Sequence, residues 1–486
     1  MEESVVQNGL MPEMPLGWQS WDIHQKSDGN VQDWGLPEKA GRDMWWILWQ
    51  QNDSVTHKWV VTFMEDANIS GQTYSSEWYD EHAILVTWWT ITISDATITK
   101  VGDVDGDNAD FYWTNAAVIA IDGVLELNND DISTEWSHSN AVFAYGDGEI
   151  IISDSVIITQ DDSSWWIMVT WWWTITANNV IVTTNWNSSA AIRSDRWWGT
   201  INVNWGSYTS NGVWSPAIYS TADIIVENAQ LTATQSEWAI VEWKNSIKII
   251  NSTLMDFNTT LHWHSATYKN IFLYQSMSWD ADEWTASFTA KDSKIITNNG
   301  DTIYVTNTRA EILLQNNEIS NTNWDFLRIE AAARWKQGSN WWDVNLSLVN
   351  QGVEWDIVVD DISSLTMNLT EWSNFVWSIN SENESQNIVI KLDDSSTWTL
   401  VSDSYISKIQ SEATWYSNIN LNGYTLYVWW DAVEFTDWLS QEETWMATVE
   451  LVKDEWSSTT DIVLWWVGIL AVIVALWIGV SIYLKK

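Results

Sequence analysis

A motif that recurs every 22 to 26 residues constrains the fold of this chain more than any other feature. Each copy contains a short β-branched run, a turn with Asp, Gly or Trp, an alternating strand, an Asn, Asp or Ser corner and a third short strand. The spacing predicts a solenoid in which every repeat is one coil of three strands. Copies begin at Ile84, Val118, Val142, Ile167, Ile192, Ile218 and Ile240.

The residue types within the repeat distinguish between kinds of solenoid. Ile, Val and Thr dominate, which favours a parallel β-helix over a leucine-rich repeat, and the period is too short for a four-stranded propeller blade. We therefore predict an all-β fold, a right-handed parallel β-helix over residues 58–430, in which each coil buries its inward side chains against its neighbours. Further copies begin at Ile303, Phe326, Asp356, Asn387 and Ile419.

The segments that flank the repeats have different compositions. Residues 1–57 show no sustained period, which predicts a flexible arm, and residues 431–461 form an acidic spacer. Residues 462–484 carry no charge, so we expect a transmembrane helix there. The lysines at 485–486 would then form a cytoplasmic basic tail, with the β-helix outside the cell.

The N-terminus shows no recognisable signal peptide. Glu2 and Glu3 stand where such a peptide carries Lys or Arg, and no apolar run follows them. The export route is therefore not predicted by the sequence.

The charge balance excludes one class of partner. The chain has 21 Lys and Arg against 65 Asp and Glu, a net charge of -44, which repels phosphate backbones. Nucleic acid is not an expected partner.

No cysteine is present, which excludes disulfides, thiolate metal sites and a cysteine nucleophile. No dinucleotide or phosphate-binding fingerprint is present either, so no organic cofactor is predicted.

The tryptophan content requires an explanation. The chain has 44 tryptophans beside only 20 glycines. Runs such as Trp88-Trp89, Trp171–Trp173, Trp197-Trp198 and Trp341-Trp342 occur in turn contexts that favour glycine. We infer that many of these tryptophans are glycines, encoded by UGA in a bacterium that reads this codon as Gly. The alternative is a truly Trp-rich protein with an aromatic surface that stacks on sugars.

Residues 188–233, with Trp taken as Gly, resemble bacterial surface or secreted adhesin-like proteins with pectate-lyase-like right-handed β-helices. The resemblance covers about residues 60–430. It implies a surface location and adhesion or carbohydrate binding, and it supplies no settled catalytic residues. Similar matches occur at residues 69–100, 109–123, 240–247, 273–282 and 301–308.

An acidic stretch between two repeats predicts a possible calcium site. Asp103, Asp105, Asp107 and Asp110 place carboxylates at mostly alternate positions, as a hard cation requires. Thr114 stands where an EF-hand has its last Glu, so an EF-hand is excluded. The alternative interpretation is a solvated loop inserted between coils.

Other polar residues are candidates for chemistry on this fold. Polysaccharide lyases need a base and a group that neutralises a uronate, and Arg193, Asp195 and Arg196 are the nearest candidates. The alternative is an Arg and Asp pair that braces adjacent coils. Lys244 and Arg309 are expected to be turn or ladder residues. Two further candidates, a zinc pair with no third ligand nearby in sequence, are His262 and His264.

These features predict a membrane-anchored cell-surface protein that binds a polysaccharide or a matrix ligand without catalysis. The first alternative is a polysaccharide lyase or glycoside hydrolase on the same fold. The second is a structural envelope protein. An enzyme would need a groove where Arg or Lys meets clustered carboxylates, whereas a binding protein would present a flat face of Asn, Thr, Ser and Tyr.

Overall fold

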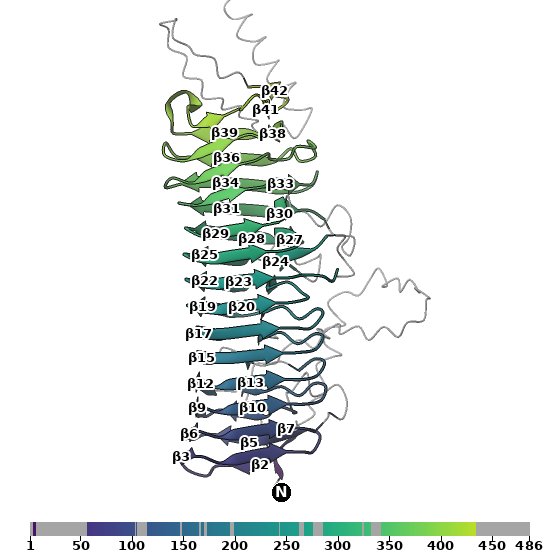
Figure 1. Ribbon diagram of the computed structural model, residues 1–486, viewed down its shortest axis with the longest axis vertical. Helices are drawn as coiled ribbons and strands as arrows, with labels where there is room; N and C mark the ends of the chain where they lie inside the picture. Colours follow the sequence, from purple (N-terminus) through teal and green to yellow (C-terminus); the bar gives the residue numbers. More distant parts are fainter. Residues whose placement is uncertain are drawn as a thin grey trace, which may run out of the picture.

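The chain folds into a rod of stacked coils (Figure 1), seen in a computed structural model. In the part of the chain that it describes, nearly all elements are β-strands and nearly all pairings between them are parallel. This arrangement is compatible with the predicted β-helix solenoid. The described residues are 3–5, 56–102, 104, 114–145, 148–164, 167–169, 173–194, 199–242, 244–261, 267–275, 285–322, 325–331 and 342–433.

One strand from each coil forms a 13-stranded sheet, which we call sheet A. Its strands, in spatial order, are β1 (Glu3–Val5), β2 (Thr56–Thr62), β5 (Glu81–Thr87), β8 (Val118–Ile121), β11 (Val142–Tyr145), β14 (Ile167–Val169), β16 (Ile192–Ser194), β18 (Ile218–Ser220), β21 (Ala239–Glu242), β24 (Lys269–Tyr274), β27 (Asp301–Thr306), β30 (Asp325–Ile329) and β33 (Asp356–Val359).

The following strands of each coil form a 22-stranded sheet, which we call sheet B. In chain order they are β3 (Ala67–Ser70), β4 (Thr73–Ser76), β6 (Thr90–Ser94), β7 (Thr97–Lys100), β9 (Val124–Asn128), β10 (Asp131–Thr134), β12 (Glu149–Ser153), β13 (Val156–Thr159), β15 (Thr174–Thr184), β17 (Thr200–Ser210), β19 (Asp223–Glu227), β20 (Gln230–Ala233), β22 (Ser246–Ile250), β23 (Thr253–Asp256), β25 (Thr285–Lys291), β26 (Lys294–Thr297), β28 (Arg309–Gln315), β29 (Glu318–Asn321), β31 (Asp343–Val349), β34 (Ser364–Thr370), β36 (Ile388–Leu392) and β39 (Lys408–Ser411).

Two small sheets complete the C-terminal coils. The first contains β32 (Gly352–Glu354), β35 (Asn374–Val376), β37 (Thr397–Thr399) and β40 (Ile419–Asn420). The second contains β38 (Ser404–Ile406), β41 (Leu426–Val428) and β42 (Asp431–Ala432). A short 3-10 turn, η4 (Thr414–Tyr416), lies between β39 and β40 in the chain.

Three strands per coil, as the repeat predicts, are clearest in the coil formed by β8, β9 and β10. The two sheet B strands of a coil are separated by a single corner, and in β15 and β17 they merge into one bent strand of 11 residues. Side chains alternate along each strand between the interior and the outside. The inward ones stack in columns along the rod, so each coil covers the apolar face of the next. One such column contains Ile91, Leu125, Ile150, Ile175, Ile201, Ile224, Ile247, Phe288, Ile312, Leu346, Met367 and Ile390.

The register of sheet A agrees with the start positions predicted from the repeat. Ile84, Val118, Val142, Ile167, Ile192 and Ile218 are consecutive partners across the sheet. The starts at Ile240, Phe326 and Asp356 were each wrong by one residue, because the partners in register are Ala239, Leu327 and Ile357. Ile240, for example, points outward. Both Ala239 and Ile240 are buried, since the outer face of sheet A is covered at this position, and hydrophobicity alone does not distinguish them.

Antiparallel strands end the coil stack at both ends. β1 pairs antiparallel with β2, and β42 pairs antiparallel with β41, so neither edge is open to a further parallel strand there. Sequence reasoning assigned no structure to the segment that contains β1. The predicted spacer and membrane helix lie outside the described residues. Among the residues that are described, no helix is long and apolar enough to span a membrane.

Two histidines are buried against each other in the first coils. His57 Nδ1 lies 2.9 Å from His82 Nε2, and His82 Nδ1 lies 2.8 Å from the carbonyl oxygen of Ala116. The carbonyl requires the proton of His82 to be on Nδ1, so Nε2 is the acceptor for His57. Protonating His82 would therefore place two N–H groups face to face. Burial lowers the pKa of His57 to about 4, and burial followed by His57 and Lys100 lowers the pKa of His82.

We expect the rod to lose stability as the pH falls through 6.5, the ordinary pKa of histidine. The unfolded chain then binds protons that the native pair does not, until the pH reaches the native pKa near 4. For His57 the loss amounts to about 3 kcal/mol. Urea unfolding at pH 7.5 and 5 measures about 2 kcal/mol of this loss, the part that falls between pH 6.5 and 5. The variant H57L/H82Q should show a smaller loss, and an equal loss in both proteins would contradict this origin.

Candidate functional site

A ladder of polar side chains follows the corner between the two halves of sheet B. The corner residue of most coils adopts a left-handed backbone conformation, with φ between 46° and 58° at positions such as Asn129, Asn179 and Asn251. Asn and Asp tolerate this conformation, and their side chains bond to the next coil. The Asn129 amide donates to Asp95 at 2.8 Å, and the Asn179 amide donates to Asp154 at 2.6 Å.

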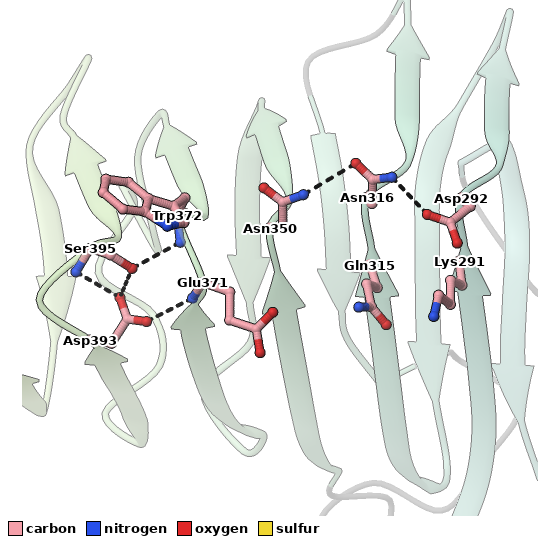
Figure 2. Close-up of a pocket in the computed structure, with 9 residues that line it drawn as sticks. All are labelled: Lys291, Asp292, Gln315, Asn316, Asn350, Glu371, Trp372, Asp393 and Ser395. Carbon is pink, nitrogen blue, oxygen red and sulfur yellow. Dashed lines mark hydrogen bonds between the residues drawn. The ribbon is translucent and has the colours of Figure 1, made fainter.

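An open hollow of about 640 Å³ lies beside this ladder in the C-terminal third of the rod (Figure 2). Two of its features matter for binding: it is polar, and it spans several coils. Its lining residues are Lys291, Asp292, Gln315, Asn316, Asn350, Glu371, Trp372, Asp393 and Ser395.

The hollow forms where the corner becomes longer. Up to Asn350 the ladder is continuous: Asn316 Nδ2 donates to Asp292 at 2.7 Å, and Asn350 Nδ2 donates to Asn316 at 3.3 Å. The next corner contains one more residue, because Gly352 pairs with Asn374 while Val349 pairs with Thr370. Two left-handed residues, Glu371 and Trp372, occupy this wider corner, and the ladder ends.

Asp393 holds the wider corner in place. Its carboxylate accepts the backbone N–H groups of Glu371, Ser395 and Ser396 at 2.7, 3.1 and 2.7 Å, and the Ser395 hydroxyl at 2.9 Å. Burial raises the pKa of Asp393, but these hydrogen bonds outweigh it and hold the pKa below its ordinary value. Asp393 is therefore a charged, fully bonded structural group.

Three side chains remain available to a ligand beside the ladder. Lys291 and Gln315 are register partners at the ends of β25 and β28, and the exposed Glu371 carboxylate is directed toward the side on which they lie (Figure 2). An ammonium, an amide and a carboxylate thus lie along one line parallel to the rod. Such a set donates and accepts hydrogen bonds, as polyhydroxyl ligands require.

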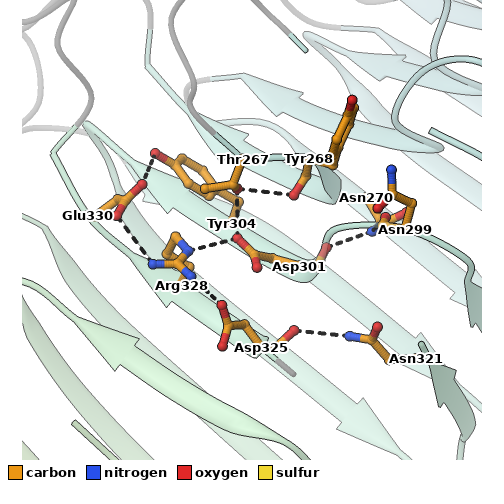
Figure 3. A network of polar contacts seen from close by, with 10 residues as sticks. All are labelled: Thr267, Tyr268, Asn270, Asn299, Asp301, Tyr304, Asn321, Asp325, Arg328 and Glu330. Carbon is orange, nitrogen blue, oxygen red and sulfur yellow. Dashed lines mark hydrogen bonds and ion pairs between the residues drawn. The ribbon is translucent and has the colours of Figure 1, made fainter. Parts of the chain in front are cut away.

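A second polar cluster lies on sheet A, at β27 and β30 (Figure 3). Arg328 donates through Nε to Asp301 at 2.9 Å and forms ion pairs with Asp325 and Glu330. The Tyr304 hydroxyl donates to Glu330 at 2.9 Å. Burial raises the pKa of Asp301 to about 7, despite the favourable charge of Arg328.

The Arg328 cluster binds adjacent coils together. Each nitrogen of the guanidinium faces a different carboxylate, and the Arg328 side chain is only 18% exposed. The three acids are consequently engaged with one cation that connects β27 to β30. The convergence of Arg and carboxylates expected of an enzyme is present, but its charges are already paired within the protein.

The structure places Arg193 in β16, away from both sites. Its guanidinium lies 5.0 Å from the centre of the Tyr219 ring. The Tyr219 hydroxyl donates a hydrogen bond to the Glu242 carboxylate. The Tyr274 hydroxyl lies 3.0 Å from the Tyr219 hydroxyl and donates to the same carboxylate at 3.3 Å. Asp195 and Arg196, the other two catalytic candidates, lie outside the described residues. Arg193 thus joins an aromatic and acidic cluster on sheet A.

The remaining sequence candidates are distributed as follows. Asp103, Asp105, Asp107 and Asp110 lie outside the described residues, as do His262 and His264. Lys244 lies in a turn and Arg309 begins β28, as expected of turn and ladder residues. Within the described ranges, no group of three or more His, Cys, Asp or Glu residues is arranged to hold a metal ion.

Sequence reasoning missed both the hollow and the Arg328 cluster. A signal for the hollow was available, because Glu371-Trp372-Ser373 is one residue longer than Asn350-Gln351 at the same place in the repeat. The partners of Arg328 come from two coils, and aligning the coils at β27 and β30 could have suggested their proximity.

No protein-family model, curated protein or solved structure matches this chain.

Proposed function

We propose that this chain is a cell-surface protein that binds glycan or matrix polymers through the hollow and the polar face of sheet B, without catalysis. The observation that carries the proposal is the hollow itself, where Lys291, Gln315 and Glu371 from three different coils offer donor and acceptor groups to a ligand. A chain-like ligand matches this geometry, because the three groups lie along the rod and span several coils.

The outer face of sheet B supports an extended binding surface. Its strands bury alternate apolar residues and direct hydroxyl, amide and carboxylate groups outward. These groups continue from coil to coil. Examples from four strands are Thr174, Thr176 and Asn178; Thr200, Asn202 and Asn204; Asp343, Asn345 and Ser347; and Thr366, Asn368 and Thr370.

The location forms part of the proposal. A right-handed β-helix of the pectate-lyase-like kind would stand outside the cell, anchored by a helix over residues 462–484. The uncharged length of that segment and the lysines at 485–486 support this orientation. Calcium bound by the acidic stretch from Asp103 to Asp110 stays a prediction.

We also propose that glycine occupies many of the positions printed as tryptophan. Trp205 lies in the corner column between Asn179 and Asn228 and has φ 66°, a conformation that costs a tryptophan energy and glycine almost none. Trp89 aligns with Gly123, because the residues that follow them, Thr90 and Val124, are register partners. A Cβ added to Gly123 would lie 3.0 Å from the Trp89 carbonyl oxygen. With glycine at these positions, the surface of the corners is polar rather than aromatic.

Trp398 differs from these corner residues. It is 1% exposed, packs near Phe375 and donates its indole N–H to the Trp377 carbonyl at 3.0 Å. Both the ring packing and the N–H hydrogen bond at this position require an indole side chain. We infer that Trp398 is a genuine tryptophan.

Catalysis is the alternative, and one observation favours it: Arg328 meets three carboxylates on sheet A, and burial raises the pKa of Asp301 among them to about 7. The full chain in mild detergent, incubated with immobilised cell-wall and matrix polysaccharides, separates the two functions. We expect retention on a polysaccharide with no shorter product released over days. Steady release of products that stops in D301N would favour the enzyme. Absence of retention on any of them would leave the structural envelope role.

A further inference from the structure

The charges around the hollow determine which glycans fit it. Asp292, Glu371 and Asp393 contribute three carboxylates, against the single ammonium of Lys291. Asp393 accepts the N–H groups of the corner and Asp292 accepts from Asn316, so Glu371 is the exposed carboxylate that remains for a ligand. The chain as a whole carries a net charge of -44, which adds a repulsive background for any anion.

We propose that the hollow selects amino-bearing hexose chains, accepts uncharged ones more weakly and rejects uronate or sulfated chains. This rests on the proposed function and names its ligand class. A sugar ammonium would pair with the Glu371 carboxylate in a charge-assisted hydrogen bond, which is shorter and stronger than a neutral one. Hydroxyl groups of the same sugar find donors and acceptors in Lys291, Gln315 and Asn350.

The direction of the ligand follows from the order of these groups. Lys291, Gln315 and Asn350 come from three successive coils, and Glu371 follows in the next. A sugar chain therefore lies along the rod, across the strands, with its ammonium-bearing unit at Glu371. Trp372 contributes a backbone N–H that donates to Ser395 at 2.9 Å, a contact that glycine makes equally well. The shape of the wider corner thus does not depend on the identity of residue 372.

Calorimetric titration of the full chain in mild detergent tests the proposal with three probes: a β-1,4-linked glucosamine tetramer, its fully N-acetylated counterpart and a tetragalacturonate. We expect the amino tetramer to bind roughly tenfold more tightly than the N-acetylated one, as one charged hydrogen bond implies. The tetragalacturonate should give no measurable heat. Raising the salt concentration should reduce the difference in affinity between the amino tetramer and the N-acetylated tetramer.

The variant E371Q should bind both glucosamine-based probes with the same weak affinity, because the carboxylate is lost while an acceptor oxygen remains. E149Q is the matched control, since Glu149 is also exposed, begins β12 and lies in a distant coil; it should bind as the original chain does. Thermal unfolding of both variants verifies that the coils are intact.

The outcomes separate the ligand class from the proposed function. Equal or tighter binding of the tetragalacturonate, or an amino preference that survives E371Q, would overturn the selectivity and leave glycan binding in place. Absence of binding to all three probes, together with no retention on immobilised polysaccharides, would overturn both.

Discussion

Replacing the seven exposed tryptophans that have a positive φ by glycine raises the free energy of unfolding of a tryptophan-containing chain by about 5 kcal/mol. A left-handed conformation costs a non-glycine residue about 1–2 kcal/mol, and the greater freedom of glycine in the unfolded chain offsets roughly half of that. The sites are far apart, so most of the effects add. The seven residues are Trp88, Trp136, Trp205, Trp214, Trp372, Trp415 and Trp430.

Urea unfolding of the recombinant chain and of the sevenfold variant measures this gain. W398G is the control, since Trp398 is buried, and we expect it to lose about 3–5 kcal/mol through the cavity that it leaves. A higher free energy of unfolding in the sevenfold variant, together with a lower one in W398G, would support glycine at the corner positions. A sevenfold variant that is less stable than its parent would mean that the exposed indoles contribute packing that outweighs their backbone strain.

E237Q is expected to destabilise the rod by about 3–5 kcal/mol, the usual consequence of leaving a buried charge without its partner. Lys269 Nζ lies 3.7 Å from Glu237 Oε1, and both side chains are at most 1% exposed. Burial lowers the pKa of Lys269, and Glu237 opposes that shift. The nearby Asp256 does not supply a replacement charge readily, because burial and then Glu237 raise its pKa well above the ordinary value.

A double-mutant cycle distinguishes the lost pair from a simple packing defect. In E237Q/K269M neither charge of the pair remains, so we expect most of the stability to return. The exposed pair of Lys294 and Glu318, at 2.6 Å, provides the contrast, and E318Q should change the stability by less than about 1 kcal/mol. A double variant as unstable as the sum of its single variants would show that the two side chains act independently.

The fold could be predicted because its cause is periodic. Six starts of the repeat, from Ile84 to Ile218, are consecutive partners in sheet A, since an alternating strand that buries one face has only one register. Ile240 was misplaced because both faces of its strand are covered. β1 was missed because three residues of antiparallel strand carry no period.

The candidate site was harder to predict from the sequence because it arises from a departure from the repeat. One extra residue at Glu371-Trp372-Ser373 ends the Asn ladder and opens the hollow, although the composition there resembles that of every other corner. Arg328 meets acids from its own coil and from the preceding one, and only the stacking of β27 on β30 brings Asp301 within 2.9 Å of it. Arg193 was noticed in the sequence, but its contact with Tyr219 and the hydrogen bond from Tyr219 to Glu242 were not.

The central claim is that the solenoid corners are small and polar, so that glycans meet carboxylates and amides rather than indoles. Peptide sequencing by mass spectrometry of the protein isolated from its native host tests it most directly. We predict glycine at positions 88, 205 and 372 and tryptophan at position 398. Tryptophan at the three corner positions would contradict the claim and would make the exposed rings the sugar-binding surface.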